Sequence, residues 1–463
     1  MHDVVIKGGT VVSPEQGIFE ADIGIDGELI TTVSTAGDID GERAIDATGR
    51  HVFPGVIDPH THFGLFRPLA DDADTESRSG LVGGVTTTGN IFRRGKSYPA
   101  IMDDFFKTAE SNYRHDYFFT LGLLSHAHAT EIDEVIDEFG ITSFKWYMNY
   151  KLQAAERFGL EQNLLDDVAD HFISELAAVD EPTTLAYHAE NAEITAHLTE
   201  QLQDAGRDGY DAIVERFPGY AEAQSLVAGA SHTRQHGYDD DFYAVHVSAK
   251  ETAEELARLQ SMGYGVTGET CTHYLCLTSE ECDDRMKINP PIRSQADQDA
   301  LWEHLAGGTL SIVGTDHIAN KRANKVGEDI WESMWGSPST ATLFPLVLSE
   351  GLHEDRLGLR RVAAVTSTNA AKAYDIYPKK GSLRPGTDAD IVVADIEETK
   401  TVTPELLQSS ADYTMYTGRE VTGWPTQTLV RGRIAYENGE VTAPPGHGTH
   451  IDRPIVAGDE RDG

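Results

Sequence analysis

The middle of the chain alternates between short apolar runs and longer stretches in which apolar residues recur with helical spacing. A strand buried on both faces reads as a continuous apolar run, and a parallel neighbour requires a crossover that is usually a helix. Repeated strand and helix units predict a parallel sheet, and eight of them are typical of a closed (β/α)8 barrel. The eight predicted strands are residues 56–61, 85–88, 118–124, 142–148, 183–187, 242–247, 263–268 and 310–314.

The two ends of the chain have a different pattern, with short strand-like segments separated by Gly and Pro residues. These segments are residues 3–6, 11–12, 21–25 and 29–33 near the start, and 391–394 and 429–435 near the other end. Neither group is long enough to form a stable β-sandwich by itself. We therefore predict one small β-sandwich domain built from residues 1–54 and 381–463, with the barrel, residues 55–380, inserted between its halves.

The charge balance is strongly acidic, with 37 Lys and Arg residues against 76 Asp and Glu residues and a formal net charge of -39. Such a field repels nucleic acid and anionic membrane surfaces, so we expect neither as a partner. The acidic residues are spread along the chain, which is typical of proteins from a salt-rich, haloarchaeal cytoplasm. The odd number of cysteines (Cys271, Cys276 and Cys282) and the absence of a signal-peptide pattern also predict a cytoplasmic location.

Two histidines separated by one residue, His60 and His62, stand at the end of the first predicted strand. Side chains alternate along a strand, so these two point the same way and can bind one metal ion. A pair of this kind also occurs at surface turns without a metal, so its weight depends on the other strand ends, which meet at one mouth in a barrel. Further candidate ligands stand at or just beyond the ends of later strands: Lys145, His188, His246 and Asp316.

Lys145 differs from the other candidates because metal cations repel an ammonium group. Its neighbours in the segment Ser143-Phe-Lys-Trp-Tyr-Met148 are mostly apolar, and such a setting lowers a lysine pKa and favours the neutral amine. A neutral amine can add carbon dioxide to form a carbamate, which supplies the negative bridging ligand that two close cations require. We therefore predict two divalent metal ions, held by the four histidines, Asp316 and a carboxylated Lys145.

This ligand set resembles that of the cyclic amidohydrolases, a family that includes dihydropyrimidinases, hydantoinases, allantoinases and dihydroorotases. The likeness rests on six ligand positions in order and spacing, with the segments Gly55-Val-Ile-Asp-Pro-His60 and Gly268-Glu-Thr-Cys271. It covers nearly the whole chain, including the split β domain. The resemblance implies two zinc or similar divalent ions, Lys145 as an N6-carboxylysine, and a homodimer or homotetramer that acts on a small cyclic amide.

Three features favour the dihydropyrimidinase and hydantoinase branch of this family. Dihydroorotases of the similar type carry an Arg two residues after the second His, where this chain has Gly64. Tyr150 follows Lys145 by five residues, similar to a dihydropyrimidinase tyrosine that hydrogen-bonds the developing oxyanion. The segments 71–80 and 83–87 also look like that branch.

Two positions depart from that branch and leave the identity of the ring open. Asn289 stands where dihydropyrimidinases usually have Ser, and Pro338 stands where they have a substrate-binding Asn. A proline has no N–H, so a backbone donor is lost there. We expect Asn289 and Ser337 to contact substrate, at sites that look closer to those of dihydroorotases or allantoinases.

The resemblance implies hydrolysis of a cyclic amide or imide C–N bond, in a dihydropyrimidine or hydantoin ring. Asp316 would take the proton of the attacking water and pass it to the departing ring nitrogen, and Tyr150 would stabilise the oxyanion. Allantoinase or dihydroorotase activity is an alternative that shares every metal ligand. A deaminase usually lacks the bridging lysine. A non-enzymatic, dihydropyrimidinase-related interaction protein would be expected to have lost ligands, and this chain retains all six.

Overall fold

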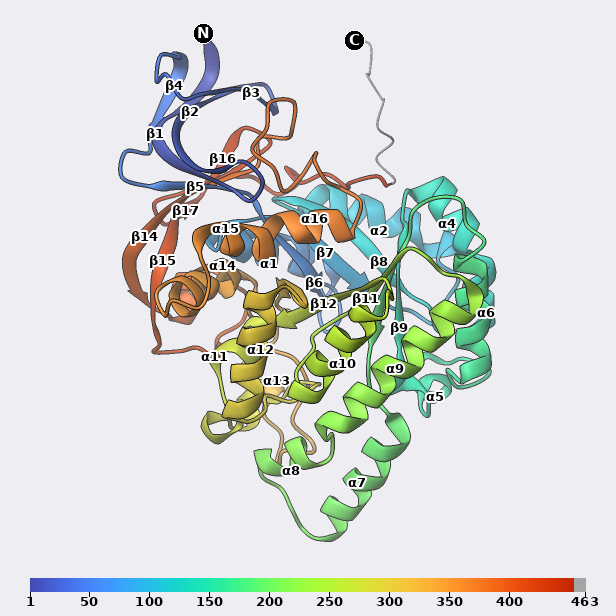
Figure 1. The fold of residues 1–463 in the computed structure, drawn as a ribbon. Coiled ribbons are helices and arrows are strands. Elements are labelled where there is room, and N and C mark those ends of the chain that lie inside the picture. The colour runs from blue at the N-terminus through green and yellow to red at the C-terminus, as the bar shows by residue number, and fades with distance from the viewer. Residues whose placement is uncertain (454–463) are drawn as a thin grey trace.

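The computed structural model describes residues 1–453, and eight parallel strands pair in chain order to form its central sheet. The two edges of this sheet meet, because the backbone N–H of His62 donates to the carbonyl of His317, just beyond the last strand, at 2.9 Å. The predicted (β/α)8 barrel is therefore confirmed (Figure 1). Its strands are β6 (Val56–Thr61), β7 (Val85–Phe92), β8 (Asp116–Gly122), β9 (Ser143–Tyr147), β10 (Thr184–His188), β11 (Asp241–Ala244), β12 (Val266–Cys271) and β13 (Leu310–Gly314).

Helices surround the barrel (Figure 1). In α4 (Ile132–Phe139) the apolar residues Ile132, Val135 and Ile136 are buried and the acidic residues are exposed, and Gly140 ends the helix with a φ of 60°. The other long helices are α1 (Leu69–Val82), α2 (Pro99–Asn112), α6 (Asp166–Leu176), α7 (Ala192–Asp204), α9 (Gly219–His236), α10 (Lys250–Ser261) and α12 (Gln295–Gly307). The short ones are α3 (His126–Thr130), α5 (Ala154–Phe158), α8 (Tyr210–Glu215), α11 (Thr272–Cys276), α13 (Arg322–Lys325), α14 (Leu343–Val347), α15 (Leu359–Ala363), α16 (Asn369–Ala373) and α17 (Pro404–Leu407). Within residues 1–453, no helix combines the length and the apolar character needed to cross a membrane.

Every predicted barrel strand overlaps an observed one, but β7 extends to Phe92 beyond the predicted 85–88, and the positions around β11 and β12 also differ. The strand predicted at 242–247 ends at Ala244, and the one predicted at 263–268 is observed at Val266–Cys271. The shift of β12 has a local cause, because Gly263 has a φ of 80° and its N–H donates to the carbonyl of Gln260. The residues before Val266 therefore form the turn that ends α10.

The two ends of the chain share a second sheet of nine strands. Its halves join where β5 pairs antiparallel with β14, with Phe53 opposite Val392, and buried residues of both halves form one core. The domain bounds 1–54 and 381–463 stay a prediction, and residues 454–463 lie outside the described part of the chain. The strands are β1 (His2–Ser13), β2 (Gly17–Asp26), β3 (Leu29–Ser34), β4 (Gly41–Asp46), β5 (His51–Pro54), β14 (Ile391–Thr401), β15 (Glu420–Val430), β16 (Arg433–Glu437) and β17 (Glu440–Val441).

A buried cation ties this second sheet to the barrel. The Nζ atom of Lys380 lies 2.5 Å from a carboxylate oxygen of Asp116, the first residue of β8. It also lies 2.9 Å from Asp388 and 2.7 Å from Asp390, which immediately precede β14. The side chain of Lys380 is only 1% exposed. Since buried charges persist only when they are paired and hydrogen-bonded, this cluster fixes the two sheets relative to each other.

Replacing Lys380 with Met should lower the free energy of unfolding by roughly 3–5 kcal/mol, because three buried carboxylates lose their shared cation. Urea unfolding followed by tryptophan fluorescence measures the effect. The matched control is Lys7→Met, since the pair of Lys7 with Asp40 is exposed and such pairs contribute little. Equal urea midpoints for the two variants would show that the buried cluster does not hold the domains together.

Candidate active site

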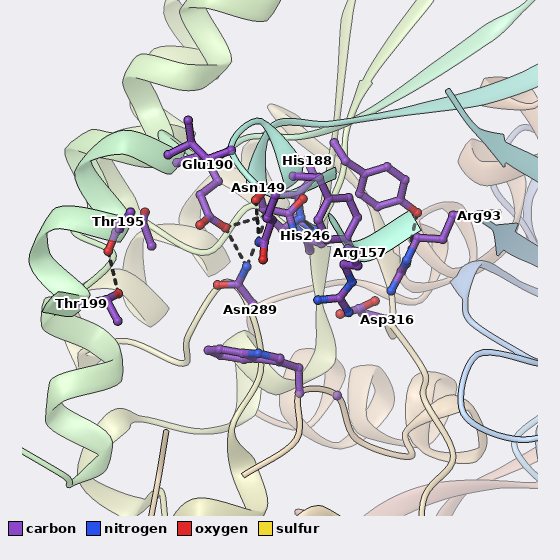
Figure 2. Close-up of a pocket in the computed structure, with 18 of the residues that line it drawn as sticks. Arg93, Asn149, Arg157, His188, Glu190, Thr195, Thr199, His246, Asn289 and Asp316 are labelled. Carbon is purple, nitrogen blue, oxygen red and sulfur yellow. Dashed lines mark hydrogen bonds and ion pairs between the residues drawn. The ribbon is translucent and has the colours of Figure 1, made fainter. Parts of the chain in front are cut away.

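A cavity of about 520 Å³ opens at the carboxyl ends of the barrel strands. Residues at and just beyond these ends converge there because the strands are parallel. Figure 2 shows His188, His246 and Asp316 within it, with Arg93 and Arg157 beside them. Seven of the residues predicted from the sequence line this cavity: His62, Lys145, Tyr150, His188, His246, Asn289 and Asp316.

His60, His62 and Asp316 form a group that is able to hold a metal ion. The Asp316 carboxylate oxygen lies 3.3 Å from Nε2 of His60 and 3.0 Å from Nε2 of His62. The opposite ring nitrogens are already occupied, since Nδ1 of His60 lies 2.8 Å from Glu269 and Nδ1 of His62 lies 3.1 Å from the carbonyl of Ile91. Both Nε2 atoms therefore face Asp316 and are available to bind a metal ion.

The protonation states of this group also suit metal binding. Burial lowers the pKa of His62 to about 3, which leaves a neutral imidazole with a free lone pair. Burial alone would raise the pKa of Asp316, but the imidazoles of His60 and His62 hold it well below its usual range. The group therefore offers the neutral imidazole of His62 and an ionised carboxylate, donor types that divalent zinc takes in proteins.

Lys145 lies next to this group, in the middle of β9. Its Nζ atom is 2.9 Å from Nε2 of His60, and the residue is 1% exposed. Burial lowers the pKa of Lys145 to about 7, although Asp316 and Glu269 act in the opposite direction. Near neutral pH, the side chain is therefore a neutral amine in a large fraction of the molecules. The neutral amine is the form that reacts with carbon dioxide.

His188 and His246 form a second pair of facing imidazoles. Nδ1 of His188 lies 2.8 Å from Nε2 of His246, and Nε2 of His188 lies 3.1 Å from the carboxylate of Glu190. Burial lowers the pKa of both histidines. Two neutral imidazoles in this arrangement present nitrogen lone pairs toward one point, which suits a cation.

The backbone is unusual at two of these residues. His246 has a φ of 41° and Asp316 has a φ of 48°, both in the left-handed region that residues other than glycine seldom adopt. Each stands just after a barrel strand, β11 or β13. Backbone conformations of this kind cluster at functional sites, where the surrounding structure holds them in place.

Glu269 organises the site, although the sequence alone did not identify it as a site residue. It is fully buried in β12 and accepts hydrogen bonds from the hydroxyl of Tyr243 at 2.8 Å and the backbone N–H of His246 at 3.0 Å. With the Nδ1 atom of His60, these partners satisfy the hydrogen-bonding capacity of a fully buried carboxylate. Its position as the one charged residue within β12 is a signal that could have indicated it.

Tyr150 follows β9 in a single 3-10 turn, Met148–Tyr150, and lines the cavity. Two guanidinium groups approach its ring, with Cζ of Arg93 at 5.5 Å and Cζ of Arg157 at 5.1 Å from the ring centre. Arg93 also approaches the hydroxyl of Tyr147 at 3.3 Å. Neither arginine was predicted as a site residue, because nothing in the local pattern shows that Arg93 is buried.

The two predicted substrate contacts, Asn289 and Ser337, differ in their placement. Asn289 lines the cavity and donates to Glu190 at 2.7 Å, as Figure 2 shows. Ser337 is buried, and its carbonyl accepts the N–H of Ile318 at 3.0 Å. The neighbouring Gly336 lines the cavity, whereas Ser337 is not among the lining residues. The structure therefore brings Asn289 to the cavity but not the side chain of Ser337.

Comparison with known proteins matches the amidohydrolase family to residues 51–435. The chain is 30% identical to a D-hydantoinase of Ralstonia pickettii, over 97% of this chain and 99% of that protein. It is also 30% identical to an L-hydantoinase of Paenarthrobacter aurescens, over 98% of both. The solved structure of an L-hydantoinase (dihydropyrimidinase) from Arthrobacter aurescens superposes with a TM-score of 0.90 at 29% identity, over 98% of this chain and 100% of that one. The chain therefore belongs to the amidohydrolase family.

Proposed function

We propose that this protein is a metal-dependent hydrolase that opens a cyclic amide or imide by cleaving a ring C–N bond. Whole-chain similarity to hydantoinases supports a hydantoin or dihydropyrimidine as the ring. The observation that carries the proposal is the gathering of Lys145, four histidines and Asp316 at the base of one cavity. Such a cluster of buried neutral donors and one carboxylate fits a metal centre better than a structural core.

The donor set divides naturally between two divalent cations, for which we propose zinc. His60, His62 and Asp316 would hold one ion, and His188 and His246 would hold the other. Lys145 would join the two sites as a carbamate, formed when its neutral amine adds carbon dioxide and releases a proton. The fit rests on nitrogen atoms that already face one another and on second ring nitrogens held by Glu269, Ile91 and Glu190.

When bound, two such ions supply Lewis acidity, which makes hydroxide available near neutral pH and polarises a substrate carbonyl. The side chains account for the remaining steps. Asp316 accepts the proton of the attacking water and later delivers it to the ring nitrogen as the C–N bond breaks. Tyr150 lines the same cavity, and its hydroxyl would donate to the oxyanion that forms on the carbonyl oxygen when the carbonyl carbon is attacked.

Replacing Lys145 with Ala should lower both bound zinc and kcat on hydantoin, the latter by about a hundredfold or more, because the bridging ligand is lost. Metal content is measured by mass spectrometry on the purified protein. Added acetate should restore part of both, since it supplies a carboxylate to the space left by the side chain. Lys250→Ala is the matched control, because Lys250 is exposed on α10. Full activity and metal content in Lys145→Ala would refute the bridging role.

Replacing Glu269 with Gln should weaken zinc affinity by about 10- to 100-fold, because the amide is a weaker acceptor for Nδ1 of His60. Competition with a coloured chelator measures this affinity without any substrate. Glu255→Gln provides the control, since Glu255 lies on α10 and pairs with Arg258 at the surface. An unchanged affinity would mean that Glu269 is needed only for packing.

The substrate itself is tested by measuring turnover of hydantoin, dihydrouracil, allantoin and dihydroorotate with added zinc in concentrated salt. The proposal expects ring opening of hydantoin or dihydrouracil. Turnover of dihydroorotate alone would instead place the protein with the dihydroorotases. The absence of both bound metal and turnover would favour a non-enzymatic interaction protein.

A further inference from the structure

A basic cavity adjoins the proposed active site. It has a volume of about 460 Å³ and shares Leu65, Arg93 and Arg157 with the larger cavity. Arg94 and Lys96 also line it, and none of the described residues in its wall is Asp or Glu. Four cations without an acidic neighbour are unexpected in a chain that has 76 acidic residues and only 37 Lys and Arg residues. This concentration of positive charge points to an anion as the occupant.

The environment of the Arg93 side chain supports binding of an anion at this position. The residue is 8% exposed, and its side-chain hydrogen bonds are with uncharged groups, the hydroxyl of Tyr147 at 3.3 Å and Nδ1 of His62 at 3.5 Å. Since Nδ1 of His62 also faces the carbonyl of Ile91 at 3.1 Å, it is a poor acceptor for a guanidinium. The carboxylate of Asp316 interacts with the charge of Arg93 electrostatically, but no carboxylate among residues 1–453 forms an ion pair with it. A buried guanidinium without a counterion is unfavourable unless a ligand supplies the charge.

Arg216, the third arginine that lines the larger cavity, differs from Arg93 because it has a carboxylate partner. Arg216 lies 3.9 Å from the carboxylate of Glu190 and 3.2 Å from the side-chain oxygen of Asn289. Its charge is therefore balanced within the protein. Arg157 resembles Arg93 in having no ion-pair partner in the described part of the chain, but it is exposed at the cavity mouth. Of the three arginines that line the larger cavity, Arg93 and Arg157 are therefore the two that no carboxylate of residues 1–453 pairs, and they are free to bind an anion that enters with the substrate.

The position of Tyr150 connects these arginines to the reaction. Its ring lies 5.5 Å from Cζ of Arg93 and 5.1 Å from Cζ of Arg157, so both guanidinium groups are close to it. If Tyr150 contacts the carbonyl under attack, a short substituent on the same ring lies within reach of both arginines. A planar guanidinium binds a carboxylate through two parallel hydrogen bonds, which would orient the ring as well as hold it.

We propose that the natural substrate is a cyclic amide whose ring substituent carries a carboxylate, bound by Arg93 and Arg157. This inference rests on the proposed function and narrows its substrate class. The neighbouring Leu65 and Phe66 would contact the aliphatic part of the substituent.

The test compares two substrates that have nearly the same shape and differ in charge: hydantoin-5-acetic acid and hydantoin-5-acetamide. With the zinc-loaded protein, kcat/KM should be higher for the acid by about 10- to 100-fold, the effect of one or two charge-assisted hydrogen bonds. Most of the difference should lie in KM, and it should shrink as potassium chloride screens the exposed Arg157. An equal or higher kcat/KM for the amide would overturn the proposal.

Two variants locate the anion site. Arg157→Gln and Arg93→Gln should each reduce the ratio of acid to amide kcat/KM by about tenfold. Arg234→Gln is the matched control, because Arg234 also stacks on a tyrosine, Tyr264 at 4.7 Å, but on the outer helix α9. If both cavity variants lose activity equally on the two substrates, the arginines support the fold of the site and do not bind an anion.

Calorimetric titration separates failure of this inference from failure of the proposed function. If neither of these hydantoins nor any of the four rings named above is opened, the hydrolase assignment fails, and binding of the acid in preference to the amide still decides whether the anion site exists. Preferential binding of the acid that is lost in Arg93→Gln supports the site. Equal binding of acid and amide refutes it, whatever the activity.

Discussion

The hydrogen bond between Nδ1 of His60 and the carboxylate of Glu269 is the interaction on which the rest of the site depends. This hydrogen bond is 2.8 Å long and buried, and it orients the ring so that Nε2 of His60 faces Lys145 and Asp316. The same carboxylate accepts the backbone N–H of His246 and the hydroxyl of Tyr243, so it also joins β11 to β12. An apolar residue here would leave those donors unsatisfied in the barrel interior, and a neutral amide would weaken each contact.

The charge distribution separates the site from the rest of the molecule. The formal net charge of the chain is -39, whereas the smaller cavity beside the site is lined by Arg93, Arg94, Lys96 and Arg157 and by no Asp or Glu of the described residues. Surface carboxylates are screened by salt within about 8–10 Å at ordinary ionic strength, but buried charges are screened much less. A strongly acidic chain and the proposed recognition of a negatively charged substituent are therefore compatible.

The barrel and most of the proposed ligand residues could be predicted because both depend on local patterns. The shared orientation of His60 and His62 follows from the alternation of side chains along a buried strand. The ends of parallel strands then meet at one mouth of the barrel. Glu269 and Arg93 could not be assigned in this way, because their roles depend on partners far along the chain. The Glu269 contact with His60, for example, spans 209 residues. Ser337 is a different case. It was predicted to contact substrate, but only the neighbouring Gly336 lines the cavity.

The left-handed backbone of His246 and Asp316 connects the stability of the barrel to its chemistry. A non-glycine residue with positive φ costs of order 1–3 kcal/mol, so the surrounding structure must hold it there. The hydrogen bond from His246 N–H to Glu269 does so after β11, and the edge contact of His317 with His60 does so after β13. In a regular strand, the side chains would continue to alternate between the two faces. At His246 and Asp316, the turn after the strand instead directs the side chain into the cavity. The barrel provides enough hydrogen bonds to hold both strained positions, which is why such a site is placed at its strand ends.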